Sequence, residues 1–160
     1  MIYSAEDLLP AVRARIERSA LLRERVDLIG HVPHDRITTF FSAADLFVVG
    51  SHHEGSGYAL MEACACGAVP VVTDIPTFRI LTADGTLGAL WNPGDAAGFA
   101  GVLADVARRD LPTLRNHLIQ YFERELSWPA IGRRAVEIYR DVLSWVVNGR
   151  GRGKARSTRP

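Results

Sequence analysis

The chain has 160 residues, of which 48% are hydrophobic and 23% are charged. These fractions exclude a disordered or fibrous chain, and the length allows one globular domain. No apolar run reaches the roughly 18 residues that cross a membrane, and the first residues lack the basic and then apolar pattern of a signal peptide. We therefore expect a cytoplasmic protein.

The charge is unevenly distributed, although the net charge is only +1. Five basic residues fall in the last eleven positions, and the rest of the chain carries 14 basic and 18 acidic residues. The terminal segment has no large apolar residue, so we predict a domain over residues 1–147 and a disordered basic tail over 148–160. No aromatic residue is interleaved with these charges, so we expect no specific nucleic-acid binding and at most peripheral membrane contact.

The first half of the chain alternates between helical and strand patterns. Apolar residues spaced three to four apart predict an amphipathic helix over residues 5–22. A short strand is expected at Val26–Gly30, then a helix over about 35–43. The apolar run Leu46–Val49 predicts a second strand, covered on both faces as in a parallel sheet.

The alternation continues in the second half. The pattern predicts helices at 57–66, 77–81, 96–108, 112–125 and 130–147, and strands at 68–73 and 87–91. Gly67 is expected to end the first of these helices and Asp95 to cap the third. The predicted fold is α/β: a Rossmann-like parallel sheet of about four strands with flanking helices, which binds ligands at the carboxyl ends of its strands.

The segment between the second strand and the following helix holds the candidate site. A strand that runs through a glycine-rich turn into a helix presents unpaired backbone N–H groups to whatever lies above the sheet edge. Glu54 precedes the turn, Gly55 and Gly57 remove side-chain bulk from it, and Glu62 follows in the helix. Carboxylates would repel a phosphate that touched them, so we expect the two glutamates to bind hydroxyl groups such as those of sugars and riboses.

This segment closely resembles the two-glutamate signature of the retaining nucleotide-sugar glycosyltransferases of group 1 (glycosyltransferase family 4), which have the GT-B fold. Similar stretches are Val26–His34, Ser42–Val49, Glu62–Asp74 and Leu90–Asp95. Together they cover about residues 5–147. The resemblance implies the carboxyl-terminal, donor-binding half of a GT-B fold that lacks its first two strands.

The resemblance also implies roles for individual residues. Glu54, the catalytic candidate, would bind hydroxyls of the donor sugar, and Glu62 would bind the ribose. The backbone of the turn would contact sugar and diphosphate, and a second loop would lie against the nucleotide base. The residues implied are Gly55, Ser56, Gly57, Tyr58 and Ala59 for the turn, and Gly30, His31 and Val32 for the second loop. Family members use neither a cofactor nor a divalent metal, and they transfer the sugar with retention of configuration.

The departures from the family pattern predict a half-enzyme. The family's first strand ends in a Gly-Arg pair, and a nearby lysine helps to clamp the diphosphate. This chain begins after both, and its only lysine is Lys154. We expect a truncated protein that binds donor weakly and needs the amino-terminal GT-B portion or a partner chain, with open sheet edges that favour self-association. Arg79 stands where many relatives carry a glutamate.

Other patterns carry less weight, and one alternative function stays open. His52 and His53 point apart on an extended chain and match no zinc-binding spacing, and Cys64 and Cys66 are too few for a disulfide framework. The tryptophans, Trp91, Trp128 and Trp145, are expected to pack in the core or between domains rather than to stack on sugars. The alternative is a non-catalytic binding or assembly module derived from a glycosyltransferase.

Overall fold

The computed structural model describes the backbone of residues 8–153 and the side chains of residues 8–146. Where the sequence predicts one domain over 1–147, the backbone forms two compact units, Met1–His34 and Asp35–Pro160. The candidate glycine-rich turn lies in the second unit.

The first unit holds two short helices, α1 (Leu9–Glu17) and α2 (Ala20–Arg25). The sequence predicts one continuous helix here, and that prediction is wrong because Ser19 breaks it. Ser19 adopts an extended conformation, and its side chain accepts a hydrogen bond from the backbone N–H of Leu22 at 3.3 Å. This is N-capping, which serine favours over a place in a helix interior.

The strand predicted at Val26–Gly30 does not form. These residues have neither helical nor strand structure, and Leu28 and Ile29 are 46% and 58% exposed. A strand needs a ladder of backbone hydrogen bonds to a neighbour. No ladder in the described part of the chain includes these residues, so an apolar pattern alone does not make them a strand.

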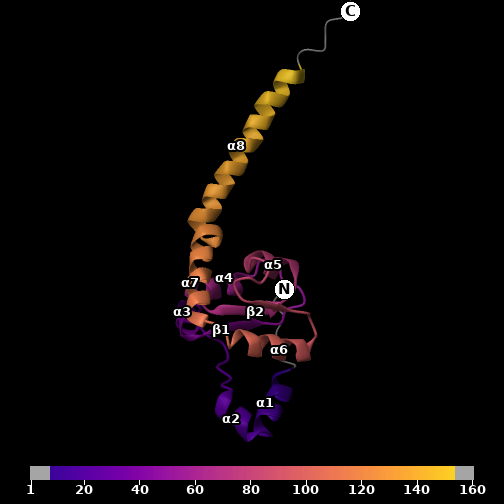
Figure 1. Ribbon diagram of the computed structural model, residues 1–160, viewed down its shortest axis with the longest axis vertical. Helices are drawn as coiled ribbons and strands as arrows, with labels where there is room; N and C mark the ends of the chain where they lie inside the picture. The colour runs from indigo at the N-terminus through magenta and orange to yellow at the C-terminus, as the bar shows by residue number, and fades with distance from the viewer. Residues whose placement is uncertain (1–7, 154–160) are drawn as a thin grey trace, which may run out of the picture. The chain divides into compact units, whose positions relative to one another are not determined.

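The second unit carries the alternating pattern (Figure 1). Its elements are α3 (His34–Ala43), β1 (Leu46–Val49), α4 (Tyr58–Cys66), β2 (Val69–Thr73), α5 (Pro76–Leu81), β3 (Ala89–Trp91), α6 (Ala96–Val106), α7 (Leu111–Tyr121), the π-helical turn η1 (Phe122–Leu126) and α8 (Trp128–Gly153). Each strand and helix predicted from residue 35 onward has a counterpart in this unit.

The sheet is parallel, with the order β1-β2-β3. Val48 pairs with Val71 on one side of β2, and Thr73 pairs with Trp91 on the other. The α/β class and the parallel pairing are therefore confirmed, with three strands in the described residues rather than about four.

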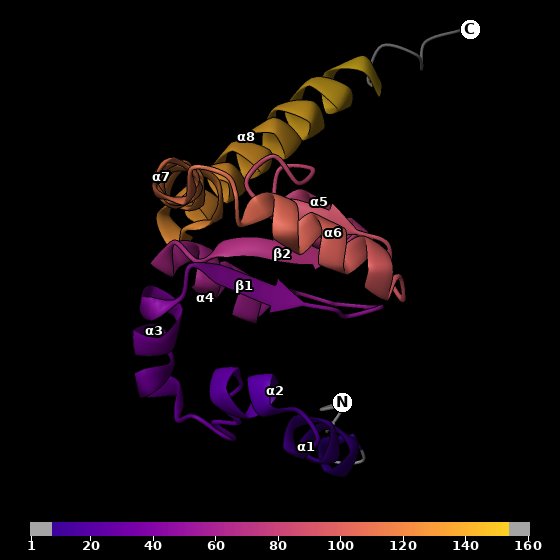
Figure 2. The ribbon, with the colours of Figure 1, turned by 60° about the horizontal axis from the view of Figure 1, so that its bottom comes forward.

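Both faces of the central strand β2 are covered, but the cover predicted over both faces of Leu46–Val49 is incomplete, because Val48 is 44% exposed. Val69 and Val71 of β2 pack in a cluster with Val106 of α6, whereas Val72 packs in a second cluster with Phe78 and Leu118. Figure 2 shows α6 lying along the sheet and α7 leading into α8. All five residues of β2 are buried, because this central strand has a helical layer on each side.

Two predicted helix ends are confirmed. Gly67 ends α4 with a left-handed φ of 79°, and the Asp95 side chain accepts a hydrogen bond from the Gly98 N–H at 2.8 Å at the start of α6. Arg115 of α7 forms hydrogen bonds to the carboxyl ends of α3 and α4. Its Nη2 donates to the carbonyl of Cys66 at 2.8 Å and to that of Ser42 at 3.0 Å.

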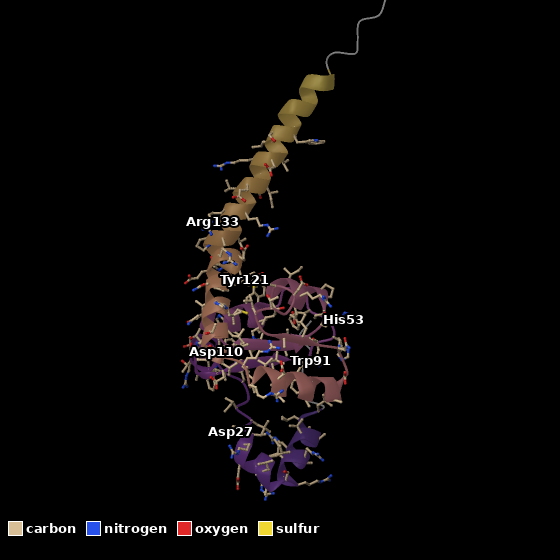
Figure 3. All side chains as sticks on the ribbon, viewed as in Figure 1. Asp27, His53, Trp91, Asp110, Tyr121 and Arg133 are labelled. Atoms are coloured by element: carbon tan, nitrogen blue, oxygen red, sulfur yellow. The ribbon has the colours of Figure 1, made fainter. Side chains whose placement is uncertain are left out.

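The carboxyl-terminal helices differ from the prediction in three ways. The expected helix 112–125 changes into the π-helical turn η1, and α8 continues to Gly153 rather than ending at Val147. Residues 148–153 of the predicted disordered tail are thus helical, and 154–160 lie outside the described residues. Trp91 is buried as expected, but Trp128 and Trp145 are 79% and 75% exposed, so the prediction that they pack in a core is wrong for the described structure. Figure 3 shows the side chains that project from α8 around Arg133.

Candidate functional site at the glycine-rich turn

The glycine-rich turn connects the carboxyl end of β1 to the start of α4. Thr73, at the end of β2, donates its hydroxyl to the Ser51 carbonyl at 2.5 Å, and Thr77 donates to the Glu54 carbonyl at 2.8 Å. A Cβ on Gly50 would lie 3.6 Å from the ring of Trp91, at the end of β3. The turn is thus held at the carboxyl edge of the sheet, where parallel α/β folds bind their ligands.

Gly57 fixes the entry into α4. Its φ is +66°, and a Cβ at this position would lie 2.6 Å from Cδ1 of Leu81. The left-handed conformation favours glycine, and a larger residue would also displace the Leu81 side chain. Gly57 is also the N-cap residue of α4 and, having no side chain, makes no side-chain cap. The first N–H groups of α4 therefore have no side-chain cap from the N-cap residue.

The turn lines an open pocket of about 340 Å³, called here the glycine pocket. Its lining residues come from the turn, from the first residues of α4, and from the core beneath: Val49, Glu54, Gly55, Ser56, Gly57, Tyr58, Ala59, Leu60 and Phe78. The catalytic candidate and all five predicted turn contacts therefore share one pocket. No lysine or arginine is among these lining residues.

The Glu54 side chain folds back over the turn. Its Oε1 accepts a hydrogen bond from the Gly57 N–H at 3.4 Å, which is longer than the usual 2.7–3.2 Å for this type of bond. The rest of the side chain is exposed. A contact this long is weak, so a ligand hydroxyl can replace it at small cost.

Glu62 lies in a different pocket from Glu54. This second cavity of about 310 Å³ is bordered by α4, η1 and the start of α8, and we call it the Trp128 pocket. It is lined by Tyr58, Met61, Glu62, Phe122, Leu126, Trp128 and Ile131. Tyr58 lines both cavities. The structure thus brings the two predicted glutamates to neighbouring pockets rather than to a single one.

Gly30, His31 and Val32 belong to the first unit. Gly30 has a φ of +74°, and a Cβ there would meet no atom within 4 Å. The contact of this loop with a nucleotide base stays a prediction.

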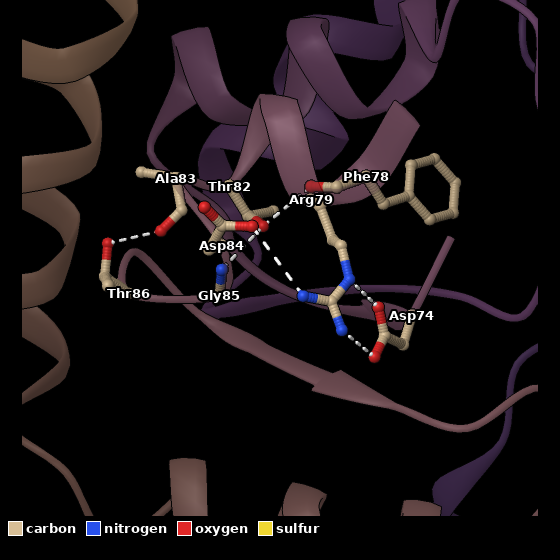
Figure 4. A network of polar contacts seen from close by, with 8 residues as sticks. All are labelled: Asp74, Phe78, Arg79, Thr82, Ala83, Asp84, Gly85 and Thr86. Carbon is tan, nitrogen blue, oxygen red and sulfur yellow. Dashed lines mark hydrogen bonds and ion pairs between the residues drawn. The ribbon is translucent and has the colours of Figure 1, made fainter. Parts of the chain in front are cut away.

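Arg79 is engaged by two acidic side chains (Figure 4). Its Nη2 donates to Asp74 Oδ2 at 2.5 Å and its Nε donates to Asp74 Oδ1, while Asp84 lies 3.8 Å from Nη1. The hydrogen bond to Asp74, followed by the charge of that carboxylate, raises the pKa of Arg79. These acids offset the charge of Arg79.

The described residues contain no group of three or more histidine, cysteine, aspartate or glutamate side chains that could hold a metal ion. Both cysteines are free, and burial raises the pKa of the Cys64 thiol to about 12. That thiol therefore stays protonated and unreactive at neutral pH.

Two residues of this region were not singled out by their sequence pattern. Thr73 and Thr77 hold the turn through backbone carbonyls that no pattern identifies in advance.

A parallel α/β sheet with a glycine-rich strand-to-helix turn at its carboxyl edge defines the Rossmann-like class of folds. Within that class, residues 13–125 match the family described as "Glycosyl transferases group 1". The chain belongs to this family, which confirms the resemblance to GT-B glycosyltransferases.

Individual relatives agree with the family. The chain is 30% identical over 125 residues to a GDP-mannose:cellobiosyl-diphosphopolyprenol alpha-mannosyltransferase of Xanthomonas oryzae, covering 76% of this chain and 33% of the relative. It is 34% identical over 110 residues to a D-inositol 3-phosphate glycosyltransferase of Thermomonospora curvata, covering 67% and 25%. Among solved structures, a sucrose-phosphate synthase from Thermosynechococcus elongatus matches with a TM-score of 0.66 and 26% identity, covering 84% of this chain and 35% of that one.

The chain spans about a quarter to a third of the length of these relatives. Within the part of the chain that the structure describes, no helix has the length and apolar character needed to cross a bilayer.

Proposed function

We propose that this chain is the donor-binding part of a retaining glycosyltransferase, and that its glycine pocket holds the sugar and diphosphate of a nucleotide-diphosphate sugar. One observation carries the proposal: Glu54 and the five turn residues line one open cavity at the start of α4. A cavity of about 340 Å³ lies at the lower end of the range for small-molecule sites, which suits one part of such a donor.

Each part of the pocket has a task in this proposal. The first N–H groups of α4, together with the positive end of the helix dipole, face the diphosphate and stabilise the charge that grows on it as the sugar leaves. Glu54 accepts hydrogen bonds from sugar hydroxyls and so orients the ring. Gly55 and Gly57 let the donor approach the backbone closely.

The missing component in this proposal is positive charge. No basic side chain lines the glycine pocket, and Arg79 is paired with Asp74. We therefore propose that the chain binds donor but does not transfer the sugar alone, and that the amino-terminal GT-B portion or a partner chain supplies the cations and the acceptor site. No divalent metal is required in this scheme, because helix N–H groups and basic side chains together take the metal's role.

The names of the relatives leave the donor sugar and the acceptor open. One relative is named for GDP-mannose and a diphosphopolyprenol acceptor, and another for D-inositol 3-phosphate. The proposal for this chain is limited to a nucleotide-diphosphate sugar as donor.

Calorimetric titration with UDP-glucose, GDP-mannose and ADP-glucose tests the proposal. We expect at least one of them to bind, and Glu54→Gln to weaken that binding about 10-fold, because a charge-assisted hydrogen bond to a sugar hydroxyl is lost. Glu137→Gln, an exposed acid of α8, is the matched control and should bind like the unchanged chain. Addition of EDTA should leave the affinity unchanged, and no nucleoside diphosphate should be released from the sugar.

Two results would contradict the proposal. The first is the absence of binding heat with all three sugar nucleotides, which would favour a non-catalytic assembly module instead. The second is equal affinity in Glu54→Gln and Glu137→Gln, which would remove Glu54 from the site. Circular dichroism of each variant establishes that the comparison is made between folded proteins.

A further inference from the structure

We propose that two copies of this chain form a symmetric dimer in which their α8 helices pair in antiparallel orientation. The inference goes beyond the proposed function and does not rest on it. None of the residues named above as lining the glycine pocket belongs to α8, so the two surfaces are separate.

An apolar stripe, called here the α8 seam, runs along one side of the last helix. Its residues recur at alternating intervals of three and four positions, which is the 3.5-residue period of a coiled coil. They are Trp128, Ile131, Ala135, Ile138, Val142 and Trp145. All except the partly buried Ala135 are 43–79% exposed. A contiguous exposed apolar surface marks an interaction site, and a helix in a protein owes most of its stability to packing of its apolar face.

The opposite side of α8 is polar. Arg133, Glu137, Arg140 and Ser144 recur there with the same spacing, and all four are exposed. The helix therefore has one face for water and one for a partner. The polar face carries two positive charges and one negative charge, whereas helices that lie on anionic membranes are rich in basic residues on this face. This balance favours a protein partner.

The α8 seam is complementary to itself when two copies run antiparallel. The layers then pair Trp128 with Trp145, Ile131 with Val142 and Ala135 with Ile138, the second residue of each pair belonging to the other copy. The small Ala135 thus faces a larger side chain near the centre of the seam, as a close-packed layer requires. In a parallel pair it would face another alanine and leave a gap.

Two charges beside the seam favour the same orientation. Arg134 and Asp141 occupy equivalent places of the seven-residue repeat, and both are exposed. Antiparallel pairing brings these places together, so Arg134 of each copy lies opposite Asp141 of the other. A parallel pair would instead set Arg134 beside Tyr139, with no opposite charge to meet. Charges that flank a seam determine partner and orientation in this way.

The area that this pairing buries is enough for a stable dimer. Trp128, Tyr139 and Trp145 are 68–79% exposed, and Tyr139 borders the seam. At about 150–250 Å² for each buried aromatic side chain, the six rings of two copies would remove roughly 900–1,500 Å² from water. Specific interfaces bury about 1,200–2,000 Å² in total, and the aliphatic residues of the seam add to the rings.

Sedimentation equilibrium of the full chain tests the dimer, with Ile138→Glu compared with Ser144→Glu. The unchanged chain should show the mass of two chains at about 100 μM. Ile138→Glu should raise the dimer Kd at least about 100-fold, because it places two unpaired carboxylates in the seam. Ser144→Glu adds the same charge on the polar face and should leave the Kd unchanged. Ile138 belongs to neither core cluster, and circular dichroism checks that both variants are folded.

A charge exchange tests the orientation. Arg134→Glu should raise the dimer Kd about 10-fold, because symmetry replaces two opposite-charge pairs by two like-charge pairs. The double variant Arg134→Glu/Asp141→Arg should restore the affinity of the unchanged chain. Restoration requires that these two residues meet across the interface.

Three results would overturn the inference. The first is the mass of a single chain for the unchanged protein; binding of that monomer to vesicles of phosphatidylcholine and phosphatidylglycerol would then assign the seam to a membrane surface. The second is a dimer that Ile138→Glu leaves intact, which would place the association elsewhere, as at the open edge of β1. The third is a double charge variant that stays as weak as Arg134→Glu, which would exclude antiparallel pairing.

Discussion

Replacing Phe78 by alanine is expected to lower the free energy of unfolding by about 3–5 kcal/mol, the range for deletion of a buried aromatic ring. Phe78 is 1% exposed and packs in the cluster that joins α4, β2, α5 and α7. The surrounding strand and helices cannot collapse fully into the space that the ring leaves. Because a domain is stable by only about 5–15 kcal/mol, this one change removes a large share of the total. Urea denaturation followed by circular dichroism measures it.

Ile80→Ala is the control for Phe78→Ala. Ile80 belongs to the same helix, but its side chain is 70% exposed, so the expected change is within about 0.5 kcal/mol. Phe78 also lines the glycine pocket, so Phe78→Ala should weaken sugar-nucleotide binding even where the protein is still folded. Equal losses of stability in the two variants would show that the cluster is not the core of this unit.

Replacing Gly88 by alanine is expected to destabilise the sheet by about 3 kcal/mol, the upper part of the usual range for overpacking. A Cβ at this position would lie 2.1 Å from the carbonyl oxygen of Pro70 and 2.7 Å from its Cγ. The oxygen belongs to the backbone of the central strand, so it cannot move aside as a flexible side chain would. The contact has to be relieved by shifting β3 away from β2, which weakens their ladder.

Gly101→Ala provides the matched control for Gly88→Ala. Gly101 lies within α6, and a Cβ there would meet no atom within 4 Å. Alanine should therefore stabilise this helix by about 0.5–1 kcal/mol, because it loses less backbone entropy on folding than glycine. Thermal denaturation of both variants measures the difference. Similar midpoints would contradict the packing of Gly88 against Pro70.

The parts of the fold that depend on local chemistry could be predicted from the sequence. The run of apolar residues in β2 predicts a strand covered on both faces, Gly67 predicts the end of α4, and Asp95 predicts the start of α6. In each case the residue type itself satisfies the requirement, by burial, by a left-handed φ or by a side-chain cap. The glycine-rich turn was predicted for the same reason.

The errors concern features that depend on distant partners. Val26–Gly30 has the composition of a strand, yet no strand in the described residues pairs with it. The periodicity of α8 indicates an apolar face, but only the packed structure shows that Trp128 and Trp145 are exposed. The spacing of Glu54 and Glu62 likewise gives their separation along the chain, whereas the cavities that they line are formed in part by later residues. Phe78 lines the first cavity, 24 positions after Glu54, and Phe122 lines the second, 60 positions after Glu62.

The contacts of Arg115 bear on how long the folded unit survives. One guanidinium nitrogen reaches the last turns of two helices, across 73 positions to Ser42 and 49 to Cys66. Both acceptors come within reach only when α3, α4 and α7 have already assembled, so this bridge should form late on the folding pathway. Interactions that form after the transition state slow unfolding more than they speed folding. Arg115 is thus expected to lower the unfolding rate of this unit and so to lengthen the lifetime of its native state. Its effect on the folding rate should be small.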